Sequence, residues 1–329
     1  MRAAVCGRYG PPEVVEIQEV PTPEPGDGEV RIAATTTTVN SGDARLRAMN
    51  VPRGMGPMAR VAVGFTKPRQ PVFGFDVAGR VDAVGRGVTG FQIGDRVVGS
   101  RALKLGCHAE RVIVAEDGAI VAIPEGMGDQ EALAPCFGGL TALHYLEEGK
   151  LASGQSLLVN GASGAVGAAA VQLAKHMGAE VTAVCSAAHG ELIADLGADH
   201  VVDYATEDFT GDGHRYDVIM DTHGNAPYAR IKGSLAPGGR FLMVVGDLLQ
   251  TLGAARHKNI VSGTSKTTAE GLRKILELVG TGEMRPVIDS VHPFDQIVEA
   301  HRRVDGGHKA GSVVVTFDGA NDEAGEGPS

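Results

Sequence analysis

The central part of the chain alternates short apolar runs with stretches of helical periodicity. The apolar runs predict strands at Ser156–Asn160, Glu180–Cys185, His200–Asp203, Val218–Asp221, Arg240–Val245 and Asn259–Gly263. Helices are predicted at Gly190–Leu196 and Ala226–Leu235, and a further helix at Thr268–Gly280 leads out of this unit. Such alternation specifies a parallel sheet with helices on both faces. We therefore expect a doubly wound α/β unit in the centre of the chain.

Both ends of the chain have a different, β-rich pattern. Short strands between Gly, Pro and Asp turns are predicted at Glu29–Ala34, Val77–Val84, Arg96–Gly99 and Arg111–Val114. A helix is predicted over residues 129–147, with Asp129 as its N-cap. The pattern returns to β at Val287–Phe317, with a short helix near Phe294–Val304. The chain is thus expected to rejoin its first region, before a Gly- and acid-rich tail, Gly319–Ser329, that is expected to be disordered.

The turn after the first central strand is the most informative stretch. Ala162-x-Gly164-x-x-Gly167 fills the small-residue positions of a dinucleotide fingerprint, with alanine where the first glycine is usual. Gly164 allows the backbone to approach a pyrophosphate, and the free N–H groups of the following helix favour phosphates. The turn predicts a dinucleotide site with contacts at Gly161, Ala162, Ser163, Gly164, Ala165, Val166 and Gly167.

Two other interpretations of this turn are weaker. The glycines could serve a tight strand–helix turn alone, but such a turn rarely needs three small residues at this spacing. The segment also nearly matches the Gly-x-Ser-x-Gly nucleophile elbow of hydrolases, with Ser163 as nucleophile. It fails at Ala165, where the strained turn needs its second glycine.

Composition narrows the class of protein. The 329 residues suffice for two domains, and 43% hydrophobic and 21% charged residues are typical of globular proteins. A formal net charge of −10 argues against non-specific nucleic-acid binding. The start has no signal-peptide pattern, no apolar run is long enough to span a bilayer, and four scattered cysteines give no disulfide framework. We expect a cytoplasmic protein with no membrane or nucleic-acid partner.

Motifs along almost the whole chain occur in the order typical of one family. They are Val39-Asn40-Ser41-Gly42-Asp43, Gly74-Phe75-Asp76-Val77-Ala78-Gly79, Gly94-Asp95-Arg96-Val97, Gly138-Gly139-Leu140-Thr141-Ala142, Gly161–Gly167, Gly197–Tyr204 and Gly307–Val315. On these residues the chain resembles the medium-chain dehydrogenase/reductase superfamily, and looks most similar to its zinc-free, zeta-crystallin-like quinone oxidoreductase branch. The resemblance implies a GroES-like, β-rich substrate domain (residues 1–124 and 267–329) around a Rossmann domain (residues 125–266). It also implies hydride transfer from a nicotinamide coenzyme between the two domains, and a homodimer, often joined near Asn259–Gly263.

The second central strand bears on the choice of coenzyme. A site for NAD usually has Asp or Glu at the end of this strand, but here it ends in Val184-Cys185-Ser186. This absence favours NADPH over NADH, because a carboxylate would repel a 2′-phosphate. Ser186, His189 and Tyr204 are candidate ligands of that phosphate, although His189 stands where the family often has Lys or Arg and could equally be a solvated residue at a helix start. By resemblance, further coenzyme contacts fall at Asp221, Val245, Gly246 and Lys309.

Zinc members of the superfamily need a set of cysteine and histidine ligands that this chain lacks. Phe75 stands where a Gly-His-Glu motif would carry its histidine, and phenylalanine cannot bind a metal. Cys136 is better interpreted as core packing, and the adjacent Cys107-His108 pair is poorly placed to chelate one ion. We therefore expect no zinc.

Without a Lewis acid, a conjugated carbonyl is an easier hydride acceptor than a simple ketone. The chain is thus predicted to be an NADPH-dependent reductase of quinones or α,β-unsaturated carbonyls. By resemblance, Asn40 donates to the substrate oxygen, or only caps the helix that follows, and Thr141 orients the nicotinamide, or is an ordinary helix threonine. No acid/base pair stands out, so the proton is expected from solvent. The alternatives are a catalytically weak NADPH-binding sensor and a zinc-type alcohol dehydrogenase.

The segment from Ala44 to Phe75 combines basic residues and methionines with no acidic residue. Its cations are Arg45, Arg47, Arg53, Arg60, Lys67 and Arg69. In the family this stretch borders the substrate mouth, so it could be a pliable basic lip for bulky apolar or anionic substrates. It could equally be a solvated surface loop that balances an acidic protein.

Overall fold

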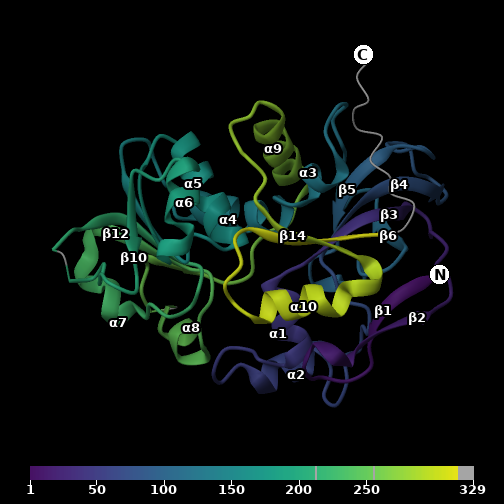
Figure 1. The fold of residues 1–329 in the computed structure, drawn as a ribbon, viewed down its shortest axis with the longest axis horizontal. Helices are drawn as coiled ribbons and strands as arrows, with labels where there is room; N and C mark the ends of the chain where they lie inside the picture. Colours follow the sequence, from purple (N-terminus) through teal and green to yellow (C-terminus); the bar gives the residue numbers. More distant parts are fainter. Residues whose placement is uncertain (212, 255, 318–329) are drawn as a thin grey trace.

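The computed structural model of the chain describes residues 1–211, 213–254 and 256–317, so the predicted disordered tail lies outside the described residues. A six-stranded and a seven-stranded sheet lie side by side, on the left and the right of Figure 1. No helix in the described part of the chain has the length and apolar composition of a membrane-spanning segment.

The six-stranded sheet is parallel throughout, in the order β10-β9-β8-β11-β12-β13. Its strands are β8 (Ser156–Asn160), β9 (Glu180–Cys185), β10 (His200–Asp203), β11 (Tyr216–Asp221), β12 (Leu235–Met243) and β13 (Ile260–Ser262). One face carries α4 (Cys136–Glu148), α5 (Ala165–His176) and α6 (Gly190–Asp195), and the other carries α7 (Tyr228–Ile231) and α8 (Leu248–Ala254) (Figure 1). The strand order reverses at β8, and doubly wound sheets bind ligands at the carboxyl ends of the strands there. The predicted doubly wound Rossmann sheet is confirmed.

Two predicted elements on this sheet were wrong in extent. The helix predicted at Ala226–Leu235 is only the short α7, which begins after Pro227 and gives way to a 3₁₀ turn over Lys232–Ser234. The strand predicted at Arg240–Val245 instead begins at Leu235 and ends at Met243. It begins early because Leu235 already pairs with β11, before a bulge shifts the register.

The seven-stranded sheet has the path β14-β15-β3-β4-β5-β7, and β6 pairs with β3. Its strands are β3 (Glu29–Val39), β4 (Asp76–Val84), β5 (Arg96–Ser100), β6 (Arg111–Ala115), β7 (Ala119–Ala122), β14 (Ile288–Pro293) and β15 (Ser312–Thr316). A separate ribbon is formed by β1 (Arg2–Cys6) and β2 (Val15–Glu19). The helices nearby are α1 (Ser41–Ala48), α2 (Gly56–Val63), α3 (Asp129–Leu133), α9 (Ala269–Gly280) and α10 (Ile297–Asp305).

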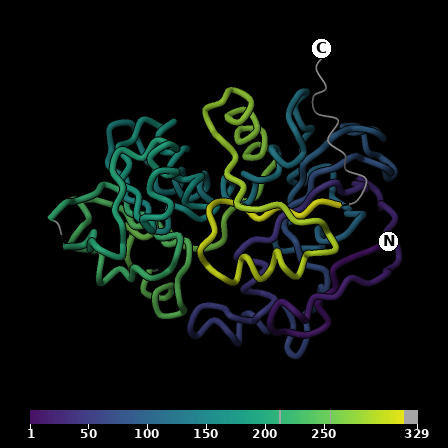
Figure 2. The backbone as a smooth tube through the Cα atoms, viewed as in Figure 1, coloured from purple at the N-terminus to yellow at the C-terminus, as the bar shows by residue number. Residues whose placement is uncertain are grey.

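The end of the chain completes this sheet, as predicted. Val313 in β15 lies opposite Val39 in β3, so the last strand runs beside one of the first (Figure 2). The domain boundaries after residues 124 and 266 stay a prediction.

Strand β3 continues five residues past its predicted end, through a run of four threonines. Two of the buried threonine hydroxyls find backbone acceptors on neighbouring strands, whereas Thr38 Oγ1 is buried without a partner. Thr36 Oγ1 donates to Val315 O at 3.0 Å, and Thr37 Oγ1 donates to Asp76 O at 2.8 Å. β-branched threonine suits a strand once its hydroxyl is satisfied.

The helix predicted over residues 129–147 is two helices, because Pro135 separates α3 from α4. Asp129 is not the N-cap. Gly128 holds that position, and Asp129 instead pairs with Arg96 and accepts a hydrogen bond from Thr35 Oγ1 at 2.6 Å.

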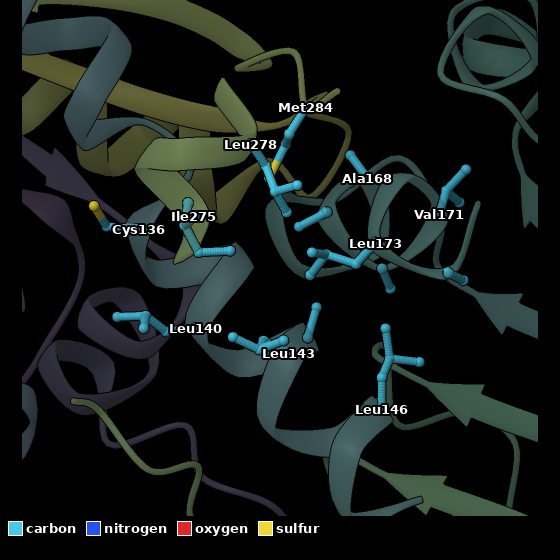
Figure 3. Packing of buried hydrophobic residues seen from close by; sticks show 14 of the residues in the cluster. Cys136, Leu140, Leu143, Leu146, Ala168, Val171, Leu173, Ile275, Leu278 and Met284 are labelled. Carbon is cyan, nitrogen blue, oxygen red and sulfur yellow. The ribbon is translucent and has the colours of Figure 1, made fainter. Parts of the chain in front are cut away.

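The largest apolar cluster joins α4, α5 and α9 to the six-stranded sheet (Figure 3). Two glycines of α4 make this packing possible. A Cβ on Gly138 would lie 2.2 Å from Ala165 O, and a Cβ on Gly139 would lie 2.8 Å from Ile275 Cδ1. The start of α5, where the fingerprint lies, is therefore held in place by close backbone contact with α4.

Candidate active site

The fingerprint turn has the geometry of an anion-binding site. Gly161 adopts φ 82°, a region that disfavours side chains. A Cβ on Gly167 would lie 2.2 Å from Gly161 O, so only glycine lets α5 approach the turn. A Cβ on Gly164 would meet nothing closer than 3.7 Å, and no side chain caps α5. The first N–H groups of α5 are therefore left for a ligand.

The candidate phosphate ligands gather at the ends of two neighbouring strands. Ser186 Oγ lies 3.2 Å from His189 Nδ1 after β9. Tyr204, which follows β10 and is 56% exposed, donates its backbone N–H to Cys185 O at 3.2 Å. The parallel pairing also places Asp203 opposite Cys185, which the inspection of β9 alone missed. Its carboxylate accepts the N–H of Ala205 at 3.1 Å.

Asp221 serves the loop that follows β11. Its carboxylate accepts hydrogen bonds from Asn160 Nδ2 at 2.9 Å and from the backbone of Gly224 and Ala226 at 2.9 and 3.0 Å. Val245 lies against this loop, since a Cβ on Gly224 would meet its Cγ1 at 2.8 Å. The side chain of Asp221 thus fixes the loop beside the fingerprint, and a direct coenzyme contact for it stays a prediction.

The C-terminal turn reaches the fingerprint from the other sheet. Gly311, with φ 75°, donates its N–H to Ser163 O at 2.8 Å and forms a parallel bridge with Gly164. Lys309 precedes this turn and donates through Nζ to Gly311 O. Burial lowers the pKa of Lys309 to about 8, although Asp289 opposes the shift. Lys309 therefore belongs to the turn that contacts the fingerprint, and a coenzyme contact for it stays a prediction.

Asn40 lies at the start of α1 beside two phenylalanines. A Cβ on Gly42 would lie 2.9 Å from Asn40 Oδ1 and 3.0 Å from Phe75 Cζ, and Phe75 packs edge-on against Phe137 at 5.5 Å. Asn40 Oδ1 caps α1, accepting the N–H of Gly42 at 2.8 Å. Its Nδ2 is buried and has no partner. Asn40 is thus a helix cap that also keeps an unused donor.

Thr141 belongs to the same wall through α4. Its Oγ1 donates to Phe137 O at 2.8 Å, one turn earlier in the helix. This bond uses the hydroxyl hydrogen and leaves oxygen lone pairs, so Thr141 can still accept a hydrogen bond. Its role in orienting a nicotinamide stays a prediction.

Asp43 is a supporting residue that the sequence reasoning missed. Its carboxylate is fully buried and accepts the N–H of Asn40 at 3.0 Å and that of Gly74 at 2.9 Å. It therefore ties the start of α1 to the segment that carries Phe75. Burial raises the pKa of Asp43, while His108, 4.0 Å away, opposes the shift. The reciprocal Asn40-x-x-Asp43 spacing of a capping box was the available signal.

Arg47 is not part of a solvated lip. Its side chain is fully buried and donates to both carboxylate oxygens of Asp305, at 2.7 and 2.5 Å, and to Gly10 O. In the same segment α2 contains no buried residue, whereas Phe73 and Phe75 at its end are buried. Leu248 N donates to Arg53 O at 3.0 Å, so the segment reaches the start of α8 on the other sheet.

The residues at the site do not form a metal centre. Among the residues that the structure describes, no three His, Cys, Asp or Glu side chains are grouped to hold a metal ion. Cys136 is buried and donates through Sγ to Ala132 O, as expected of core packing. His108 Nε2 lies 3.0 Å from Thr38 O, so its ring is engaged with the backbone.

Comparison with known proteins decides the family. The family of alcohol dehydrogenase GroES-like domains matches residues 26–128, and that of zinc-binding dehydrogenases matches residues 196–315. The chain is 30% identical over 325 residues to the chloroplast envelope quinone oxidoreductase homolog of Arabidopsis thaliana, covering 92% of this chain and 93% of that one. This chain belongs to the medium-chain dehydrogenase/reductase superfamily, in its quinone oxidoreductase branch. The expected GroES-like part of the fold is thereby confirmed.

Solved structures of this superfamily have the same fold. The quinone oxidoreductase from Coxiella burnetii is 25% identical, with a TM-score of 0.85 over 96% of this chain and 99% of that one. A mycobacterial protein solved in complex with NADPH is 26% identical, with a TM-score of 0.79 over 96% of this chain and 99% of that one. As a member of this superfamily, the chain is an oxidoreductase.

Proposed function

We propose that this protein transfers hydride from NADPH to a quinone or an α,β-unsaturated carbonyl without a metal ion. The observation that carries the proposal is the unpartnered, buried Nδ2 of Asn40 beside Phe75 and Phe137. A buried donor without a partner costs about 1–3 kcal/mol, which a substrate oxygen would recover. The position that a zinc-ligating histidine would need is occupied by Phe75, so activation of the carbonyl falls to hydrogen bonding.

We assign some residues of the site to coenzyme binding and others to substrate binding. The open N-terminus of α5 and the flat surface over Gly164 suit a pyrophosphate. Bound NADPH supplies the hydride. Thr141 and the Gly311 turn flank the nicotinamide side, and Asn40 Nδ2 donates to the oxygen on which negative charge develops. We expect that oxygen to take its proton from solvent.

A preference for NADPH rests on the ends of β9 and β10. Ser186, His189 and Tyr204 offer two hydroxyls and an imidazole to a 2′-phosphate, and the Asp203 carboxylate is engaged with its own turn. The NADPH complex of the mycobacterial relative supports the same assignment. An imidazole offers a 2′-phosphate less than the permanent charge of Lys or Arg, so the preference for NADPH is expected to be modest.

The assay is oxidation of NADPH, with NADH in parallel, against 1,4-benzoquinone, 9,10-phenanthrenequinone and an alkenal, each with and without a chelator. Turnover that resists the chelator and prefers NADPH is the expected result. Tight NADPH binding with no turnover on any acceptor would favour a coenzyme-binding sensor. Loss of activity with the chelator, restored by zinc, would favour an alcohol dehydrogenase and contradict the proposal.

We further propose a cytoplasmic homodimer joined through β13, the outermost strand of the six-stranded sheet. Its backbone groups on one edge are free to pair with a second copy. Light scattering of the wild type and of Ser262→Pro would test this. Phe241 N donates to Asn259 O, so in this parallel pairing Ser262 N–H faces the open edge, where proline blocks pairing with a second strand. A wild-type monomer would contradict it.

A further inference from the structure

A cavity of about 590 Å³ lies in the seven-stranded sheet, apart from the coenzyme crevice. It is bounded by β6 and by the segment Ser100–Gly106 that follows β5. β6 pairs with β3, whereas β7 pairs with β5, so the two strands diverge after their connecting turn and leave a wedge. In Figure 1, β6 lies on the side of the molecule opposite the six-stranded sheet. None of the predicted coenzyme or catalytic residues lines this wedge.

Arg101 gives the wedge an unsatisfied cationic donor. Its Nη1 crosses the wedge and donates to Ile113 O on β6, while its Nε is buried without a partner. A Cβ on Gly106 would lie 3.2 Å from Gln70 Nε2 and 3.7 Å from Arg101 Nε, so the amide and the guanidinium sit close together. Lys104 adds a second cation with no ion pair among the described residues. A buried guanidinium N–H without an acceptor is the group that an anion would satisfy.

The segment that carries these cations is held in an unfavourable backbone conformation. Ala102 has φ 47°, Leu105 has φ 55° and Gly106 has φ 101°. Each left-handed non-glycine residue costs about 1–3 kcal/mol, and such strain concentrates at ligand sites. Leu105 is 3% exposed, and Gly106 donates to Phe73 O at 3.2 Å, so packing and hydrogen bonding maintain the strain.

The remaining lining decides the class of ligand. The walls between the cations and the far end are apolar, with Val72, Ala109, Ile113 and Val114. The other charges are already used: Arg111 pairs with Asp82, and Glu29 at the far end accepts the N–H of Gly26. The volume lies within the range of small-molecule sites. We propose that this cavity binds an amphipathic carboxylate, with its head on Arg101, Gln70 and Lys104 and its apolar tail along β6.

The segment Ser100–Gly106 is hydrogen-bonded to the residues just before β4, which include Phe73 and Phe75. Arg101 N donates to Phe75 O at 2.7 Å, and His108 N donates to Phe73 O at 2.8 Å. A ligand that neutralises Arg101 therefore binds to a segment that is hydrogen-bonded to the residues Phe73 and Phe75. The site stands whether or not the proposed reductase activity is correct, because its test needs no turnover.

The test is calorimetric titration of the full chain with decanoate, with decanol as the uncharged probe. We expect saturable binding of decanoate, with decanol at least tenfold weaker. Arg101→Met and Lys104→Met should each weaken decanoate at least tenfold. Arg86→Gln is the control, because Arg86 is an exposed arginine paired with Asp27 outside the cavity.

Three outcomes would overturn the proposal. One is the absence of saturable decanoate binding up to millimolar concentration. The second is equal affinity of decanoate for the wild type and Lys104→Met, an exposed substitution that does not threaten folding. The third is displacement of decanoate by NADPH or by a quinone, which would place it in the catalytic crevice.

Discussion

The glycines of the fingerprint turn provide a test that separates folding from coenzyme binding. A methyl group on Gly164 has at least 3.7 Å to its nearest neighbour, and the residue has φ −69° and ψ 166°, which alanine adopts freely. Gly164→Ala should therefore leave the free energy of unfolding unchanged or raise it by up to ~1 kcal/mol. The same methyl group enters the space assigned to the pyrophosphate. Overpacking of this kind costs about 1–3 kcal/mol, or roughly 10- to 100-fold in the Kd for NADPH.

Gly167→Ala should lower both the stability of the protein and its affinity for NADPH. Its methyl group would lie 2.2 Å from Gly161 O and 2.6 Å from Ala162 Cα, and both atoms are backbone. Since neither can move aside as a side chain would, the turn and α5 must separate. We expect a loss of at least ~1–3 kcal/mol in the free energy of unfolding, together with weaker NADPH binding.

The assay is urea unfolding beside fluorescence titration with NADPH. Gly233→Ala is the matched control, because no atom lies within 4 Å of its Cβ position and it is remote from the turn. Wild-type NADPH affinity in Gly164→Ala would refute the reasoning, since the phosphates would then not lie over this glycine. Wild-type stability in Gly167→Ala would show that the turn relaxes more easily than its contacts indicate.

Other predictions concern the donor, the coenzyme phosphate and a buried carboxyl. Asn40→Ser keeps an acceptor that caps α1 but lacks Nδ2, so kcat with a quinone should fall roughly 10- to 100-fold while the melting temperature stays within a few degrees; an unchanged kcat would exclude Asn40 as the donor. His189→Lys should tighten NADPH roughly tenfold and leave NADH unchanged in paired titrations, and an equal effect on both coenzymes would place the 2′-phosphate elsewhere. Burial raises the pKa of Asp76 to about 7, against a small opposing effect of Ser100, so the native state keeps a proton that the unfolded chain loses above pH ~4. The free energy of unfolding should then fall between pH ~4 and ~7 and level off above. Over that window the stability of Asp76→Asn relative to the wild type should rise by up to ~1.4 kcal/mol per pH unit, measured by urea unfolding at pH 5, 6 and 8. Equal pH dependence of stability in the wild type and in Asp76→Asn would contradict the raised pKa of Asp76.

The features that the sequence predicted correctly depend on strong local signals. The strands β8, β9 and β10 have the predicted bounds because each is a compact run of strand-forming residues closed by a turn. The tight turn between β8 and α5 was recognisable because Gly167 is required by a contact within a few residues, with Gly161 O. The predicted return of the chain end to the first sheet followed from the change of pattern at Val287.

The features that were missed depend on contacts between distant segments. The strand predicted at Glu29–Ala34 continues through four threonines, because β15 and β4 supply acceptors for Thr36 and Thr37. Arg47 looked like a surface charge, but Asp305, from α10, allows it to be buried. Asp129 looked like a helix cap, but Arg96 binds it instead. In each case a polar side chain was judged by its neighbours in sequence, whereas its partner comes from elsewhere in the chain.

The pairing of β3 with β15 determines the order in which the protein can be assembled. The hydroxyl of Thr36 bonds to the carbonyl of Val315, 279 positions later in the chain. During synthesis the six-stranded sheet is complete before Ser312 is made, whereas the other sheet must wait with part of β3 uncovered. An uncovered strand edge invites pairing with other chains, and contacts this distant in sequence form slowly. The nascent protein therefore passes through a stage in which the edge at Thr36–Val39 is still uncovered although most later strands are paired, and aggregation at that stage would compete with folding.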